Sequence, residues 1–190
     1  MKKMFMQRWL NTRGYGVQSP FAFNFLHDVI RQKIPYYAYG ELRKSRRPDE
    51  INTVQEDEML FRIANFAQTK SIIMPAEWKG SSRYLSAGCT TAKIEFYTND
   101  NVAQTIERQD PLGIVCYNQP QNFLETEQLL LSKTGEQTIC IIKNLLLAPE
   151  IWNIILQDDK VSVLFDIRNW GILFINTKLT HGRYYITDFK

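Results

Sequence analysis

Apolar and polar positions change their rhythm along the chain at about residue 70. Beyond it, short apolar runs of strand length alternate with longer stretches in which apolar residues recur at helical spacing. The candidate strands are 71–74, 93–97, 112–117 and 138–142, and the candidate helices are 81–87, 101–108, 122–131 and one opened by Pro149. Strands that alternate with helices are typical of βαβ units, so the pattern predicts an α/β fold with a mostly parallel sheet.

The residues before this point predict helices. Ser19 and Pro20 form a helix cap followed by a proline at the first helical position, and apolar residues then recur at helical spacing to about Gln32. A second helix is expected over 56–67, where the apolar positions lie on one face. We therefore expect a helical cap over 1–69 and an α/β core over 70–190, within one domain 1–190.

The C-terminal part of the chain loses the helical pattern. Three stretches, 161–167, 170–175 and 183–189, have strand character and are joined by short turns that contain Asn169 or Gly182. Short turns connect antiparallel neighbours, so we expect antiparallel pairing at this end of the sheet.

Length and cysteine content narrow the class of protein. The longest apolar runs, such as 145–148, are far shorter than the roughly 20 residues that a membrane-spanning helix needs. The first ten residues lack the continuous apolar core of a secretory signal, so export is not expected. Cys89, Cys116 and Cys140 fit neither a disulfide framework nor a zinc ribbon. These features predict a soluble, cytoplasmic protein with reduced, buried thiols and no membrane partner.

The net charge of +3 is spread over the chain except for one basic run just before Pro48. We interpret this run, Arg43, Lys44, Arg46 and Arg47, as a solvated loop. A phosphate-contacting loop is the alternative, with the neighbouring aromatics Tyr36, Tyr37 and Tyr39 exposed for stacking. The basic stripe is weak, so a nucleic-acid partner is not expected; the expected partner is a small molecule or a protein of unknown identity.

Three stretches of the chain resemble one family. Residues 13–21, R-G-Y-G-V-Q-S-P-F, resemble the R-x-H-G-V-H-S-P-F opening segment of class I S-adenosylmethionine-dependent methyltransferase-like proteins of the Bacteroidetes type. Residues 73–87 resemble their first strand, loop and helix, and residues 160–174 resemble their terminal hairpin. The resemblance implies a Rossmann-like methyltransferase sandwich, with a mostly parallel sheet, an antiparallel C-terminal end and N-terminal helices.

The resemblance also implies where the cofactor S-adenosylmethionine would bind. It places Met74 at the acid of the first strand, Ala76 at the first glycine of the loop and Gly80 at the last glycine, next to Ser81. Asp100 is the candidate for the acid that holds the ribose hydroxyls after the second strand. Asn118 stands where the third strand should end in an acidic pair. The candidate cofactor-binding residues are thus Ala76, Gly80, Ser81, Asp100 and Asn118.

Several acids of the family are absent from these positions. Lys143 and Asn144 replace paired aspartates after the fourth strand, and a lysine there would repel the sulfonium of the cofactor. Losing two or three charged hydrogen bonds weakens binding by about 10³-fold. We therefore predict a degenerate methyltransferase-like protein with weak or absent cofactor binding. Two alternatives remain: an active small-molecule methyltransferase that relies on backbone, Gly80, Ser81 and Asp100, and a nonenzymatic module that binds protein or nucleic acid.

No other catalytic set is apparent in the sequence. His27 and His181 lack an obvious nucleophile and orienting acid, so both are interpreted as structural or solvated. Asp166 matches a family position in the terminal hairpin and is interpreted as a turn residue. Catalytic residues therefore stay unassigned, and no metal site is expected.

Overall fold

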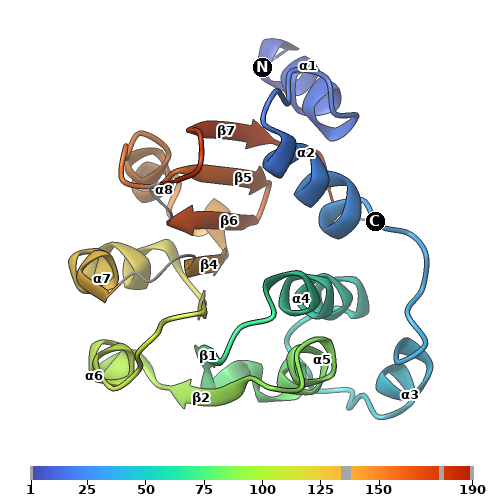
Figure 1. The fold of residues 1–190 in the computed structure, drawn as a ribbon, viewed down its shortest axis with the longest axis vertical. Helices are drawn as coiled ribbons and strands as arrows, with labels where there is room; N and C mark the ends of the chain where they lie inside the picture. Colours follow the sequence, from blue (N-terminus) through green and yellow to red (C-terminus); the bar gives the residue numbers. More distant parts are fainter. Residues whose placement is uncertain (1, 134–137, 176–177, 189–190) are drawn as a thin grey trace.

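The computed structural model describes residues 2–133, 138–175 and 178–188. Its centre is a seven-stranded sheet in the order β2-β1-β3-β4-β6-β5-β7 (Figure 1). The sheet is parallel except for β6, which runs antiparallel to both β4 and β5. The strands are β1 (Ser71–Pro75), β2 (Lys93–Tyr97), β3 (Ile114–Tyr117), β4 (Thr138–Lys143), β5 (Val163–Ile167), β6 (Trp170–Ile175) and β7 (Gly182–Tyr185). The α/β, Rossmann-like fold expected from the sequence is confirmed.

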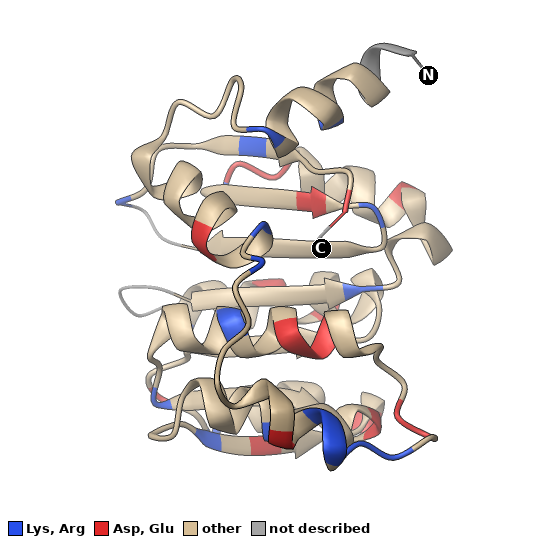
Figure 2. Ribbon diagram, turned by 90° about the vertical axis from the view of Figure 1, so that its right-hand side faces the viewer, with Lys and Arg blue, Asp and Glu red and all other residues tan. Residues whose placement is uncertain are grey.

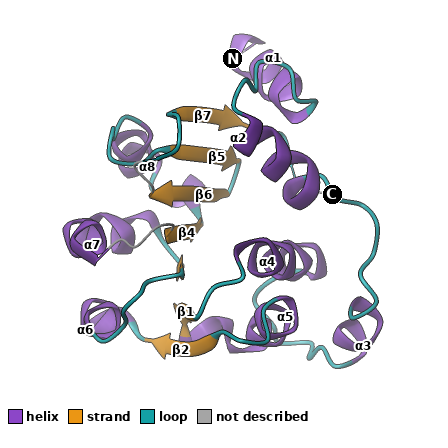
Figure 3. Cartoon of the chain, in the orientation of Figure 1, coloured by secondary structure: helices purple, strands orange, loops and turns teal. Residues whose placement is uncertain are grey.

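Helices cover both faces of the sheet, as Figure 3 shows in the orientation of Figure 1. One face carries α6 (Val102–Glu107), α7 (Pro120–Lys133) and α8 (Pro149–Leu156), and the other carries α2 (Pro20–Phe25), α4 (Val54–Ala67) and α5 (Ser82–Gly88). The strand side chains alternate between two cores, since Ile72 and Met74 belong to the cluster with α4, whereas Ile73 belongs to the cluster with α7. Each face of the sheet is therefore a separate apolar layer.

The expected helices lie close to their predicted bounds, and two further α-helices are present among the described residues. The helix predicted from Pro20 to about Gln32 is α2 followed by a π-helical turn, Leu26–Ile30. Helices α1 (Lys2–Thr12) and α3 (Tyr39–Lys44) were not predicted.

The pairing of β7 differs from the prediction. β7 pairs in parallel with β5, not antiparallel with β6, because the chain crosses over β5 after leaving β6. The expected antiparallel pairing holds for β5 and β6. Of the predicted strand 183–189, residue 189 lies outside the described residues.

Helix α1 covers the free edge of β7 through polar side chains. Asn11 Oδ1 accepts a hydrogen bond from the backbone N–H of Tyr185 at 3.1 Å, and Thr12 Oγ1 accepts one from the N–H of Thr187 at 2.9 Å. Arg8 Nη1 donates to the carbonyl oxygen of Ile186 at 2.9 Å. Side chains of α1 thus satisfy backbone groups that an edge strand otherwise leaves open to pairing with another chain.

Asp166 connects this helix to the sheet. Its Oδ1 accepts hydrogen bonds from Arg8 Nη2 at 2.8 Å and from the backbone N–H of Arg168 at 3.1 Å, and its Oδ2 accepts one from Trp152 Nε1 at 3.1 Å. The predicted turn role is therefore correct, and the buried carboxylate also anchors α1 and α8.

The basic run before Pro48 is not a solvated loop throughout. Arg43 and Lys44 belong to α3, and Arg43 forms an ion pair with Glu58 of α4 at 2.6 Å. The side chain of Arg46 is mostly buried and pairs with Asp57. The aromatics also differ from expectation: Tyr37 is exposed, but Tyr39 is buried and Tyr36 packs against Phe61. This segment is fastened to α4 by charge pairs and aromatic contacts.

Within the described residues, the helices are too short or too polar to cross a bilayer. Cys89, Cys116 and Cys140 are all buried and free, as the sequence predicted. Burial raises the pKa of the Cys116 and Cys140 thiols, which keeps both protonated.

Candidate functional site

The carboxyl ends of β1, β3 and β4 lie side by side, and parallel sheets bind ligands at this edge. The loop after β1 forms a 3₁₀ turn over Ala76–Ser81 and leads directly into α5. Trp78 lies in this turn and is almost completely buried. The turn that would approach a ligand therefore places an indole ring inside the protein.

Gly80 is covered by a side chain of the protein itself. A Cβ added to Gly80 would lie 2.7 Å from Cγ and 2.8 Å from Cδ of Glu50. The Glu50 side chain is only 5% exposed and forms an ion pair with Arg83 of α5. A glutamate carboxylate thus lies against the last glycine of the loop, beside a cation from the following helix.

Ser81 is engaged by a residue that precedes α4. It is buried, and its Oγ accepts a hydrogen bond from Asn52 Nδ2 at 2.9 Å. The Oδ1 of the same amide accepts one from Lys143 Nζ at 2.7 Å. Asn52 therefore bridges the loop after β1 and the end of β4.

The cation of Lys143 is compensated from three directions. Besides the hydrogen bond to Asn52, the Nζ of Lys143 lies 3.0 Å from Glu56 Oε2. It also lies 5.0 Å from the ring centroid of Trp170, the residue that pairs with Lys143 between β4 and β6. Trp170 Nε1 in turn donates to Glu56 Oε1 at 2.8 Å. The lysine expected to repel a cationic ligand is buried and neutralised within the protein.

Asn118, at the end of β3, is hydrogen-bonded on both sides of its amide. Its Oδ1 accepts from Trp78 Nε1 at 3.4 Å and from Asn144 Nδ2 at 3.2 Å, and its Nδ2 donates to Glu77 Oε2 at 3.0 Å. The rings of Trp78 and Trp170 lie 5.4 Å apart. Four side chains therefore cover the ends of β1, β3 and β4 and the start of β6. We call this group, which consists of Trp78, Asn118, Asn144 and Trp170, the strand-end cover.

The remaining two predicted site residues lie at the surface. Ala76 and Asp100 are exposed, and Asp100 belongs to the 3₁₀ turn Asn99–Asn101 after β2. Hydrogen bonds join the neighbourhood of Gly80 and Ser81 to Lys143, and join Asn118 to the turn that contains Ala76. Among the described residues, no hydrogen bond or ion pair joins the side chain of Asp100 to either group.

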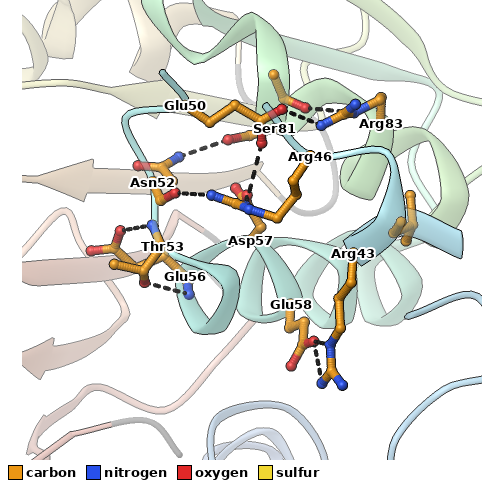
Figure 4. A network of polar contacts seen from close by, with 12 residues as sticks. Arg43, Arg46, Glu50, Asn52, Thr53, Glu56, Asp57, Glu58, Ser81 and Arg83 are labelled. Atoms are coloured by element: carbon orange, nitrogen blue, oxygen red, sulfur yellow. Dashed lines mark hydrogen bonds and ion pairs between the residues drawn. The ribbon is translucent and has the colours of Figure 1, made fainter. Parts of the chain in front are cut away.

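Charged groups around the start of α4 form the network drawn in Figure 4. Asp57 is completely buried and pairs with Arg46, whose Nη2 donates to the carbonyl oxygen of Asn52 at 2.5 Å. Burial raises the pKa of Asp57, and the nearby Ser81 hydroxyl and Arg46 guanidinium oppose that rise. The network consolidates α4, the preceding segment and α5.

The sequence analysis missed Glu50, Asn52 and Glu56 as contributors to this region. One signal was available: Thr53 and Glu56 have the spacing of a capping box, and both of its hydrogen bonds are present at the start of α4. This box locates the first turn of α4. It does not indicate that Glu56 also reaches Lys143, because that contact depends on tertiary packing.

An open cavity of about 460 Å³ lies on the outer side of the loop after β1. It contains Gly80 but none of the other predicted site residues; its lining residues are Arg47, Asp49, Glu50, Glu77, Lys79, Gly80, Ser82 and Arg83. Within the described residues, His, Cys, Asp and Glu side chains form no group that could hold a metal ion. His27 is exposed and contacts Asp28, and His181 is exposed. The arrangement is rich in internal ion pairs and offers no nucleophile with a base.

No protein-family model and no curated protein matches the chain. The chain is similar in structure to the O-methyltransferase TomG from Streptomyces achromogenes, solved in complex with SAM, at 12% identity and a TM-score of 0.52, with 76% of this chain and 91% of that chain covered. It is also similar to the O-methyltransferase from Bacillus cereus in complex with SAH, at 12% identity and a TM-score of 0.50, with 81% of this chain and 96% of that chain covered. Its similarity to cofactor-bound Rv0187 from MTB has 10% identity and a TM-score of 0.53, with 73% of this chain and 87% of that chain covered. At these identities the likeness shows the fold.

Proposed function

We propose that this chain is a degenerate relative of the class I S-adenosylmethionine-dependent methyltransferases, of the Bacteroidetes type that its residues 13–21 resemble, and that it binds the cofactor weakly or not at all. In this proposal the fold is retained for a role as a binding partner. The proposal depends on one observation: buried side chains of the protein itself occupy the ligand edge of the sheet. These are the strand-end cover and the Glu50 side chain that lies against Gly80.

The charges and shapes in this region do not fit S-adenosylmethionine. In the family, the glycine turn and the helix that follows favour the carboxylate of the cofactor. Here the side chain of Glu50 lies against Gly80 and is paired with Arg83 and Arg46, so it occupies the place at which a ligand carboxylate would approach the turn. The indole of Trp78 lies inside the turn and is hydrogen-bonded to Asn118. Ligand binding would require these buried side chains to move.

An active small-molecule methyltransferase is the second candidate. It is favoured by the cavity of about 460 Å³ beside Gly80, which is large enough for a small ligand, and by the exposed carboxylate of Asp100. In this reading the backbone of the loop, Ser81 and Asp100 supply the cofactor contacts.

A nucleic-acid module that uses residues 43–47 receives less support. Arg43 and Arg46 are paired with Glu58 and Asp57, so the free positive charge of this segment is small.

We further propose that residues 1–190 form one domain that functions in the cytoplasm. The three buried free thiols support a reducing compartment.

A thermal-shift titration with S-adenosylmethionine and S-adenosylhomocysteine tests the proposal. Saturation at about 100 times Kd adds roughly 2.7 kcal/mol to the free energy of unfolding, which for a domain of this size is about 5–10 °C. We expect no shift at millimolar ligand, while TomG, run in parallel, should respond. A saturable shift at micromolar ligand, abolished by Asp100→Asn, would contradict the proposal and favour the second candidate instead.

A further inference from the structure

Helix α1 is oriented with its polar side toward the protein. Arg8, Asn11 and Thr12 make the contacts to β5, β7 and the two residues after β7 described above. Three large apolar side chains of the helix face solvent instead: Phe5 is 64% exposed, Met6 61% and Trp9 41%. An amphipathic helix on a protein surface normally buries its apolar stripe, so this orientation leaves an apolar surface open for a partner.

The apolar stripe leads directly to a cluster of cations. Phe5, Trp9 and Arg13 follow one another at intervals of four residues, and the guanidinium carbon of Arg13 lies 3.9 Å from the centroid of the Trp9 ring. Beside them is a cavity of about 260 Å³, lined by Trp9, Thr12, Arg13, Arg31, Lys33, Thr187 and Asp188. Three cations and one acid line it, so the cavity has a net positive charge.

These positive charges face little compensation within the protein. Among the described residues, Arg31 and Lys33 have no ion pair to a carboxylate, and Arg13 is held by the Trp9 ring instead of by an acid. This contrasts with Arg8, Arg43, Arg46 and Arg83, each of which forms an ion pair. The cations beside α1 therefore remain available to an anionic partner.

We propose that α1 and this cavity form a docking surface for a lipid bilayer that contains anionic headgroups. Phe5, Met6 and Trp9 enter the boundary between headgroups and acyl chains, and Arg13, Arg31 and Lys33 bind headgroup phosphates. Figure 2 shows α1, marked by the N-terminus, projecting beyond the edge of the sheet, so its exposed side can approach a flat surface. A peripheral membrane contact needs no spanning segment, so it is compatible with the short apolar runs from which no membrane partner was expected.

Charge complementarity favours a lipid surface over a second copy of this chain. A two-fold dimer through α1 would bring the cations of both copies together, which is unfavourable. The apolar stripe favours lipid over nucleic acid, since Phe5 and Met6 gain most from an apolar environment whereas nucleic-acid contacts are dominated by phosphates. A lipid surface satisfies both halves of the site at once.

Vesicle co-sedimentation of the full chain tests this proposal. We expect binding to vesicles of phosphatidylcholine and phosphatidylglycerol in equal amounts, and much weaker binding to phosphatidylcholine alone. Arg31→Gln with Lys33→Gln should lower the partition coefficient about five-fold per cation. Phe5→Ser with Trp9→Ser should lower it by at least as much.

Matched controls lie elsewhere on the surface. Lys70→Gln with Arg108→Gln makes the same charge change near β1 and α6, and Phe96→Ser removes an apolar side chain that is 40% exposed on β2, at the opposite edge of the sheet. Both controls should bind vesicles as the unmodified chain does. All variants change exposed residues, so their unfolding temperatures should agree and a loss of binding can be assigned to the surface.

Tryptophan emission gives a second readout. Trp78, Trp152 and Trp170 are buried, so a blue shift and a loss of acrylamide quenching on vesicle addition would report on Trp9. Failure to bind the anionic vesicles, or equal binding by the Arg31 and Lys33 variants, would overturn the proposal. So would dimerisation that depends on Phe5 and Trp9, or salt-dependent retention of RNA by the same cations.

Discussion

Lys143 Nζ lies 3.0 Å from Glu56 Oε2, so the cation at the carboxyl end of β4 is paired with an acid from the first turn of α4. The two residues are 87 positions apart in the chain. Their pairing, with Asn52 and Trp170 around it, converts a strand end that could face a ligand into part of the interior.

Removing the cation of this pair should destabilise the protein. We expect Lys143→Met to lower the free energy of unfolding by about 3 kcal/mol, because it leaves the carboxylate of Glu56 largely buried without its partner. Urea unfolding measures the loss. Lys44→Met is the control, since the pair of Lys44 with Glu41 is exposed and should contribute almost nothing. Equal effects of the two substitutions would contradict the role of Lys143.

The glycine at position 80 should be needed because the Glu50 side chain leaves no room for a Cβ, and not because a ligand binds there. We expect Gly80→Ala to cost about 1–2 kcal/mol without any ligand present, because the new methyl group would overlap the Glu50 side chain. In a Glu50→Ala background the same substitution should cost much less. A double-mutant cycle by urea unfolding measures this coupling. A cost that is identical in both backgrounds would show that Glu50 does not impose the glycine.

Glu127 should make stability depend on pH. Burial, together with the neighbouring carboxyl of Asp158, raises the pKa of Glu127 from 4.5 to about 7, and Lys160 at 3.8 Å opposes the rise. The folded state therefore keeps a proton that the unfolded state has already released. The contribution of Glu127 to stability is complete below about pH 4.5 and is lost as the pH rises through 7.

Glu127→Gln should remove this part of the pH dependence, since the amide imitates the protonated carboxyl group. The difference in free energy of unfolding between the variant and the unmodified chain should grow in favour of the variant as the pH rises toward 7. Glu125→Gln makes the same change at an exposed position of α7 and should leave the pH profile as it is. A flat difference curve for Glu127→Gln would refute the assignment.

Gly88 should be required for the contact between α4 and α5. A Cβ at this position would lie 2.3 Å from the carbonyl oxygen of Phe61 and 3.1 Å from Cβ of Ala64. We expect Gly88→Ala to lower the free energy of unfolding by about 2–3 kcal/mol. Gly40→Ala is the control, since Gly40 in α3 has open space around its Cα and alanine favours helix. A stable Gly88→Ala variant would mean that α5 can move away from α4.

Local patterns in the sequence were sufficient to predict most of the fold. The strands from 71 onward, the helix opened by Ser19 and Pro20 and the antiparallel β5–β6 pair were all identified, because apolar periodicity, caps and short turns act over a few neighbouring residues. The family resemblance also pointed, without a structure, to Ala76, Asn118 and Lys143 as positions where this chain differs from the glycine and the acids of that family. These features predicted a methyltransferase-like fold with an altered ligand edge.

The sequence could not determine how that altered edge is organised. The contacts of Glu50 with Gly80, of Lys143 with Glu56 and of Trp78 with Asn118 each join residues far apart in the chain. The parallel pairing of β7 with β5 follows from the path of the chain past β5, and the outward orientation of Phe5 and Trp9 from the polar contacts of α1 with the sheet edge. Such contacts follow from the three-dimensional arrangement of the elements, because the free energy of a buried charge or an edge strand depends on which distant groups surround it.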